Sequence, residues 1–184
     1  QTSSADETEG RHALVRLQDD WTQDAARRDF TINAIYLDAD GQVFDPLNGR
    51  VDLVARRLRF IGKAADRVQE DALRMLRYCR FSIDYSIGDY DSDAIQALKS
   101  FAGLATRLSG ERVAQELSKI FSHERCAPAI DLLSQTGLDK SSLGCPLLRT
   151  AMPSNPQDLR LVMRDFSWLV LFATKIAPAD VTMV

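Results

Sequence analysis

The sequence is poor in residues that build covalent or metal-bound scaffolds. Its 184 residues include three cysteines, Cys79, Cys126 and Cys145, which are odd in number and widely spaced. This spacing predicts neither a disulfide framework nor a zinc site, and it favours a reducing compartment such as the cytoplasm. The two histidines, His12 and His123, have no partners at ligand spacing. We therefore predict no metal-binding residues within this chain.

Long apolar runs and low-complexity tracts are also missing. The apolar stretch at residues 168–173 is far shorter than the roughly 18 residues that indicate a transmembrane helix, so no membrane partner is predicted. Apolar residues still make up 45% of the chain, which is enough for a hydrophobic core. The net charge of -3 argues, taken alone, against a nucleic-acid partner. However, residues 50–80 contain nine Lys or Arg and only four acidic residues, so basic charge is concentrated there.

Hydrophobic periodicity changes near Gly62 and predicts an α+β fold. The expected elements before Gly62 are a strand over residues 12–17, a helix over 21–28, a hairpin formed by 31–37 and 42–45, a helix over 51–57 and a strand over 58–61. The expected elements after Gly62 are helices over residues 64–85, 92–104, 109–122 and 127–135, and one or two helices within 157–175.

Residues 70–80 carry the most informative pattern. On a helix that advances about 100° per residue, Asp71, Arg74, Arg77 and Arg80 share one arc, opposite an apolar stripe. One acceptor beside several planar donor groups suits a nitrogen-rich base that carries a phosphate tail. The alternative is a solvated helix face with ion pairs between residues three apart.

Three further segments accompany this ridge: residues 24–34 (DAARRDFTINA), 45–53 (DPLNGRVDL) and 107–113 (RLSGERV). In this order and spacing, the four segments resemble motifs B, C, D and E of the class II tRNA nucleotidyltransferases, the CCA-adding enzymes, and of the related bacterial poly(A) polymerases. The resemblance extends over residues 10–137.

The resemblance implies three parts of such an enzyme. These are the C-terminal part of a nucleotidyltransferase head over residues 1–62, a helical neck with the base-recognition helix over 63–137, and a partial helical body over 138–184. The family pattern also includes an Asp-x-Asp pair on a strand that holds two catalytic metal ions. Asp38-Ala39-Asp40 and Asp89-Tyr90-Asp91 have this spacing but read as turns. We therefore expect a piece of a longer enzyme, inactive by itself, whose Mg²⁺ ligands lie upstream of Gln1.

Motif B supplies the residues that the resemblance places on the phosphates and the sugar. Arg28 would grip the triphosphate, because a guanidinium can bind phosphate oxygens in bidentate fashion. Asp29 and Asn33 would lie near the ribose, although both could instead be helix caps.

Motif D supplies the residues that would select the base. Cytosine and adenine both present an exocyclic amine beside an unprotonated ring nitrogen, whereas guanine and uracil present the opposite polarity. Asp71 would accept from the amine and Arg74 would donate to the ring nitrogen. Arg77 and Arg80 would face the phosphates or the neighbouring strands.

Motifs C and E allow structural roles. Residues 45–53 resemble the family's hinge, and the alternative is a tight turn followed by a helix cap. For residues 107–113 we expect helix caps and ion pairs that stabilise the neck rather than ligand contacts.

The implied reaction adds CMP and AMP, from CTP and ATP, to the 3′ end of tRNA. A bacterial poly(A) polymerase is the nearest alternative, since it shares every motif present. The alternatives from other classes are a non-catalytic nucleotide-binding or RNA-binding module and a helical interaction domain.

Overall fold

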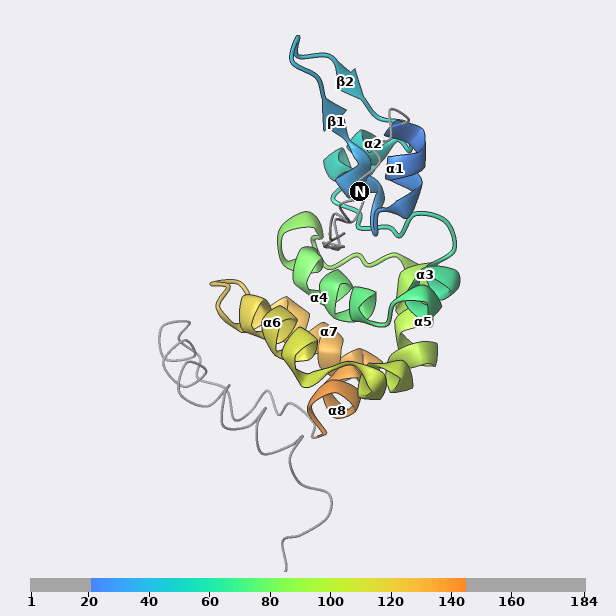
Figure 1. Ribbon diagram of the computed structural model, residues 1–184. Coiled ribbons are helices and arrows are strands. Elements are labelled where there is room, and N and C mark those ends of the chain that lie inside the picture. The colour runs from blue at the N-terminus through green and yellow to red at the C-terminus, as the bar shows by residue number, and fades with distance from the viewer. Residues whose placement is uncertain (1–20, 145–184) are drawn as a thin grey trace, which may run out of the picture.

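The computed structural model describes residues 21–144 (Figure 1). The strand expected over residues 12–17 and the helices expected within 157–175 lie outside this range. The first described part contains α1 (Trp21–Arg27), the 3-10 helix η1 (Thr31–Ala34), β1 (Tyr36–Leu37), β2 (Val43–Phe44) and α2 (Gly49–Val54).

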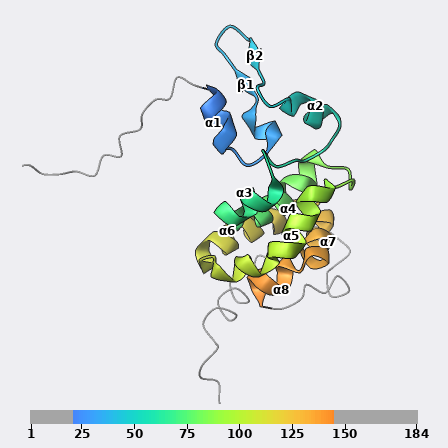
Figure 2. The same ribbon diagram turned by 90° about the vertical axis from the view of Figure 1, so that its right-hand side faces the viewer.

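The second described part is entirely helical. It contains α3 (Ala64–Glu70), α4 (Leu73–Tyr85), α5 (Ser92–Phe101), the 3-10 helix η2 (Ala102–Arg107), α6 (Gly110–Phe121), α7 (Ala127–Thr136) and α8 (Leu138–Leu143). Helix α4 packs against α6 and α7, and α3 packs against α5. Figures 1 and 2 show the β1–β2 hairpin and α8 at opposite ends of the described residues.

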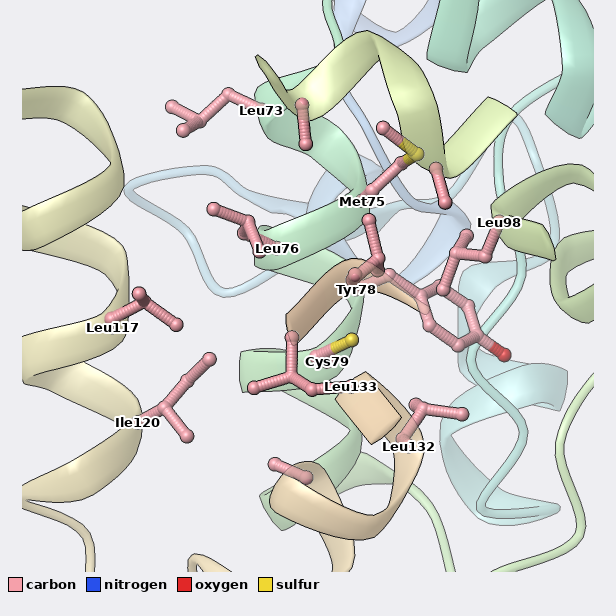
Figure 3. Packing of buried hydrophobic residues seen from close by; sticks show 14 of the residues in the cluster. Leu73, Met75, Leu76, Tyr78, Cys79, Leu98, Leu117, Ile120, Leu132 and Leu133 are labelled. Atoms are coloured by element: carbon pink, nitrogen blue, oxygen red, sulfur yellow. The ribbon is translucent and has the colours of Figure 1, made fainter. Parts of the chain in front are cut away.

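The core is centred on α4. Leu76 and Cys79 of α4 face Leu117 and Ile120 of α6 and Leu133 of α7 (Figure 3). All five side chains are fully buried. These apolar residues recur every three or four positions, so each helix presents one continuous stripe to its neighbours.

The same core continues across Gly62 into the first part of the chain. Phe30 pairs with Phe60 through an isolated antiparallel bridge, and their ring centroids lie 5.0 Å apart. The Phe60 ring stacks on Tyr78 of α4 at 5.4 Å, and the Tyr78 hydroxyl donates to the Leu58 carbonyl at 3.2 Å. The segments before and after Gly62 therefore share one hydrophobic cluster.

The single helix expected over residues 64–85 is wrong, because the chain breaks between α3 and α4. Asp71 is extended, with φ -149° and ψ 107°, and its Oδ1 accepts from the Leu73 amide at 3.0 Å. A short carboxylate side chain competes for backbone N–H groups in this way, and here it starts a new helix instead of continuing the old one. Asp71 is therefore not part of the α4 face that carries Arg74 and Arg77.

The other elements differ from expectation mainly at their ends. Residues 31–34 form a 3-10 helix instead of a strand, and residues 58–61 contribute only the Phe60 bridge. The helix expected over 51–57 runs from Gly49 to Val54, and the one expected over 92–104 ends at Phe101. The hairpin is confirmed, with Tyr36 opposite Phe44 and Leu37 opposite Val43.

Motif C adopts the turn-and-cap arrangement. The two carboxylate oxygens of Asp45 accept from the amides of Gly49 at 2.7 Å and Arg50 at 2.9 Å, at the start of α2. A hinge motion about this segment stays a prediction. The division of the chain at residues 62 and 137 also stays a prediction. Helix α8, which follows residue 137, packs on α7 and η2, which precede it.

Within residues 21–144, no helix combines the length and apolar character needed to cross a membrane.

Candidate nucleotide-binding site

Two arginines of α4 meet the motif B carboxylate. Asp29 Oδ1 accepts from Arg74 Nε at 3.0 Å, and Asp29 Oδ2 accepts from Arg77 Nε at 2.5 Å. Arg74 and Arg77 lie one helical turn apart and so project from the same side of α4. The backbone carbonyl of Asp29 accepts from the Ile61 amide at 3.1 Å, which holds the loop in place. Asp29 is thus brought together with two other predicted site residues that lie 45 and 48 positions away in sequence.

This cluster keeps hydrogen-bond donors available. Arg74 Nη1 donates to Glu70 Oε2 at 2.6 Å and to the Arg67 carbonyl at 2.9 Å. The hydrogen bond from Arg74 lowers the pKa of Glu70. Among the described residues, nothing accepts a hydrogen bond from Nη2 of Arg74 or from either Nη of Arg77. Guanidinium groups held at Nε with free Nη donors can bind acceptors of a base or a phosphate.

Arg67 ties the site to the end of α1. Its Nη2 donates to the carbonyls of Arg27 at 2.9 Å and Arg28 at 2.5 Å, and its Nη1 donates to Glu70 at 2.5 Å. A cation at the C-terminal end of a helix satisfies orphan carbonyls and complements the helix dipole. The Arg67 side chain is only 11% exposed, and its Nε has no partner among the described residues. Arg67 could not be assigned to the site from the sequence, because the carbonyls that it binds lie about 40 positions away.

Arg28 is held by the Asp24 carboxylate, which was not among the predicted site residues. Its Nε and Nη2 donate to Asp24 Oδ2 at 3.0 and 2.8 Å, and the Tyr36 hydroxyl donates to the same oxygen at 2.9 Å. The hydrogen bond from Arg28, followed by that from Tyr36, lowers the pKa of Asp24 to about 2. The Arg28 side chain is 51% exposed and remains accessible to a ligand. The spacing of four residues on a predicted helix was the signal for this pair.

Asp71 and Arg80 turn toward α6 rather than toward the Asp29 cluster. Asp71 Oδ2 accepts from Arg112 Nη2 at 2.8 Å, and Arg80 Nε donates to Glu116 Oε2 at 2.7 Å. Burial would raise the pKa of Glu116, but hydrogen bonds from Lys119 and Arg80 lower it. The ridge expected along one helix face is therefore divided between two neighbours.

Neither Asp29 nor Asn33 is a helix cap. Phe30 occupies the N-cap position of η1, whose first turn has no side-chain cap, and Asp29 binds Arg74 and Arg77 instead. Asn33 is half-buried within η1; its backbone amide donates to the Phe30 carbonyl at 2.9 Å, whereas its side-chain amide makes no hydrogen bond to the described residues. Both side chains thus remain candidates for ligand contact.

Metal-binding groups do not accompany this cluster. Nowhere in residues 21–144 do three or more His, Cys, Asp or Glu side chains come close enough together to hold a metal ion. The described residues do not fit a metal centre by themselves, and the groups of this cluster suit recognition of base, sugar and phosphate.

Two family models match the sequence. The model described as the poly A polymerase head domain matches residues 2–59. The model described as the probable RNA and SrmB-binding site of polymerase A matches residues 90–148.

Curated relatives carry the names of CCA-adding enzymes. The human CCA tRNA nucleotidyltransferase 1, mitochondrial, is 47% identical over 115 residues, which covers 61% of this chain and 26% of the relative. The mouse protein of the same name is 43% identical over 133 residues, covering 71% and 31%. The CCA-adding enzyme of Streptococcus uberis is 46% identical over 101 residues, covering 54% and 24%. The chain thus spans about a quarter to a third of the length of these relatives.

A solved structure supports the same relationship. The Bacillus stearothermophilus CCA-adding enzyme in complex with CTP superposes with a TM-score of 0.66 and 32% sequence identity, covering 86% of this chain and 40% of that chain. The predicted α+β fold class is confirmed by this likeness and by the head-domain match. From its ordered motifs, its two family-model matches and its fold, the chain belongs to the family of CCA-adding nucleotidyltransferases and poly(A) polymerases.

Proposed function

We propose that this chain is the nucleotide-selecting part of a template-independent RNA nucleotidyltransferase that adds CMP and AMP, from CTP and ATP, to the 3′ end of tRNA. The observation that carries the proposal is the meeting of Arg74 and Arg77 with Asp29, which leaves Nη donors beside the motif B loop. The names of the curated relatives and the CTP complex of the structural relative support this reaction.

In this proposal, each side chain recognises one part of the nucleotide. Arg28, fixed at its Nε by Asp24, binds triphosphate oxygens, and Asp29 and Asn33 lie near the ribose. Arg77 adds donors for the phosphates. These groups contact features that all four nucleoside triphosphates share, so they contribute affinity without base choice.

Base choice in this proposal comes from Asp71 and Arg74. Although Asp71 lies just before α4, its backbone carbonyl accepts from the Arg74 amide at 3.1 Å, so the two residues belong to one turn. Asp71 accepts from the exocyclic amine, and the free Nη2 of Arg74 donates to the adjacent ring nitrogen. Uracil and guanine would set a carbonyl against the carboxylate and a ring N–H against the guanidinium. Each mismatch costs about 1–3 kcal/mol, so two mismatches give discrimination on the order of 10²–10⁴. Arg80, paired with Glu116, supports the middle of α4 in this scheme.

The proposal also includes Mg²⁺ as the cofactor of the full-length enzyme and the cytoplasm as its location. Mg²⁺ would support phosphoryl transfer in the full-length enzyme by stabilising the leaving pyrophosphate. Cys79 is a buried free thiol, which suits a reducing compartment such as the cytoplasm, although the mammalian relatives are named mitochondrial. Fractionation of cells that express the tagged full-length protein decides between these locations.

The test is nucleotide incorporation by the full-length protein. With Mg²⁺ and a tRNA that lacks its CCA end, we expect addition of C, C and A followed by a stop, and no addition in the presence of EDTA. Arg28→Ala should reduce kcat/KM for CTP and ATP alike, whereas Arg74→Ala should also reduce selection against UTP by about 10-fold or more. The matched control is Arg125→Ala, which removes a surface arginine paired with Asp84 at 2.8 Å.

The sequence of the products separates the alternatives. Long runs of A on any RNA 3′ end would replace the CCA-adding reaction with that of a poly(A) polymerase. Nucleotide binding without incorporation would instead indicate a non-catalytic binding module. If the protein neither bound nor incorporated nucleotides, a helical interaction domain would be the remaining alternative.

A further inference from the structure

We infer that Arg112 of α6 is a positioning residue for base selection, which acts by fixing the orientation of the Asp71 carboxylate. The inference rests on the proposed function, because it concerns the residue that is proposed to accept the amine of C or A. Arg112 itself lies 41 positions away from Asp71 in sequence.

The Asp71 carboxylate is oriented by two donors. The Leu73 amide binds Oδ1 at 3.0 Å, and Arg112 Nη2 binds Oδ2 at 2.8 Å. The first contact comes from the chain itself and starts α4, so it is present whatever the side chain of residue 112. The second contact selects one rotation of the carboxylate among those that the first allows. Asp71 thus owes its final orientation to α6.

Two fixed donors leave the carboxylate able to bind a ligand. A carboxylate offers about four lone-pair positions, and these contacts occupy two of them. The Asp71 side chain is 34% exposed, so the remaining positions are reachable from solvent. An acceptor with a fixed orientation distinguishes an amine from a carbonyl better than one that rotates, because a rotating carboxylate can turn away from a mismatched oxygen.

Arg112 is itself held in place by the packing of α6. Ser109 Oγ accepts from the Arg112 amide at 3.4 Å and caps the helix. One helical turn after Arg112, Glu116 binds Arg80 of α4 at 2.7 Å. Arg112 and Glu116 lie on the same face of α6, and buried Val113 and Leu117 pack this helix against the core. Helix α6 supplies the cation of one ion pair and the anion of the other, and their partners, Asp71 and Arg80, lie before and within α4.

The experiment compares Arg112→Gln with wild type in the full-length protein. Two quantities are measured for CTP and UTP: the equilibrium Kd and kcat/KM for incorporation into tRNA. We expect the CTP-over-UTP preference to fall about two- to fivefold in both measurements, as suits a half-exposed ion pair. Arg112→Lys should recover part of the preference, because an ammonium group can still donate to Asp71.

The matched control is Arg125→Gln. Arg125 and Asp84 form a pair of the same length, 2.8 Å, with the same sequence separation of 41 residues, away from the Asp29 cluster. This variant should leave the preference unchanged. Thermal unfolding of both variants is recorded, so that a general loss of stability is recognised.

A double-mutant cycle decides whether Arg112 acts through Asp71. If it does, Arg112→Gln should change the CTP-over-UTP preference of an Asp71→Asn protein less than it changes that of wild type. Additive effects, a uniform loss for both nucleotides, or an unchanged preference in Arg112→Gln would each overturn the inference. A wild-type protein that binds CTP selectively but incorporates nothing would overturn the proposed function, while the Kd ratios still decide the role of Arg112.

Discussion

Gly49 lies where the fold has no space for a side chain. A Cβ at this position would lie 2.2 Å from the Thr31 carbonyl oxygen and 2.8 Å from its carbon. Both are backbone atoms, which cannot rotate away. The requirement for glycine in motif C is therefore steric: α2 approaches η1 too closely for any Cβ.

Gly49→Ala should destabilise the protein by about 2–4 kcal/mol, since the clash must separate α2 from η1. Urea denaturation followed by circular dichroism measures the change in the free energy of unfolding. The control is Gly103→Ala in η2, where an added Cβ meets no atom within 4 Å. Equal stability of Gly49→Ala and wild type would mean that the approach of α2 to Thr31 is not tight in solution.

Asp52 is a buried carboxylate that links α2, η1 and the chain that follows α2. It is 0% exposed and accepts from Thr31 Oγ1 at 2.7 Å, from Arg57 Nη2 at 2.9 Å and from Arg59 Nε at 2.9 Å. Burial would raise the pKa of Asp52, but the hydrogen bonds from Arg59, Thr31 and Arg57 outweigh it and lower the pKa below 3.8. The charged form therefore stabilises the fold.

The pH dependence follows from the sign of this shift. An acid with a lowered pKa in the folded state contributes stability above its unfolded pKa and loses that contribution as the pH falls through the folded value. Asp52→Asn should cost about 2–3 kcal/mol at pH 7, and the deficit should shrink below about pH 4. The control is Asp66→Asn, an exposed acid without an ion pair among the described residues. A deficit that stays constant from pH 7 to pH 3 would contradict the prediction.

At the scale of elements, the sequence predicts the helices better than their ends. Helix α6 begins after its Ser109 cap and α7 ends just before its Gly137 cap, because local cap residues encode these positions. The break at Asp71 escaped prediction because the helical period of the apolar residues continues through it. Periodicity reports which side of a segment is buried, and a single extended residue between two helices changes that pattern very little.

The candidate site was only partly predictable for a related reason. The motifs predicted Asp29, Arg74 and Arg77 as site residues, and these three side chains contact one another in the structure. The partners Arg67 and Arg112 could not be paired with the site, because each lies about 40 residues from the group that it binds and only packing brings them together. Sequence patterns predict which residue types occupy a site, whereas the ion pairs that support these residues depend on how the helices pack against one another.

At the scale of the whole molecule, the hydrophobic core argues for one cooperative unit across Gly62. Phe30 is fully buried, and its ring contacts Phe60 at 5.0 Å, Phe81 at 5.3 Å and Tyr78 at 5.9 Å. Two of these partners belong to α4. A boundary between independently folding parts would need fewer contacts across it.

Phe30→Ala should therefore destabilise both sides of Gly62 together, by about 3–5 kcal/mol. Hydrogen exchange measures this effect, because amide protection in η1 and in α4 should fall by a similar factor if both open in one transition. Ile87→Ala is the control, since that side chain is 72% exposed and its loss should change stability by less than about 0.5 kcal/mol. If α4 kept its protection while η1 lost it, the chain would open at Gly62 in two steps. The predicted division at residue 62 would then mark a thermodynamic boundary as well as a change in sequence pattern.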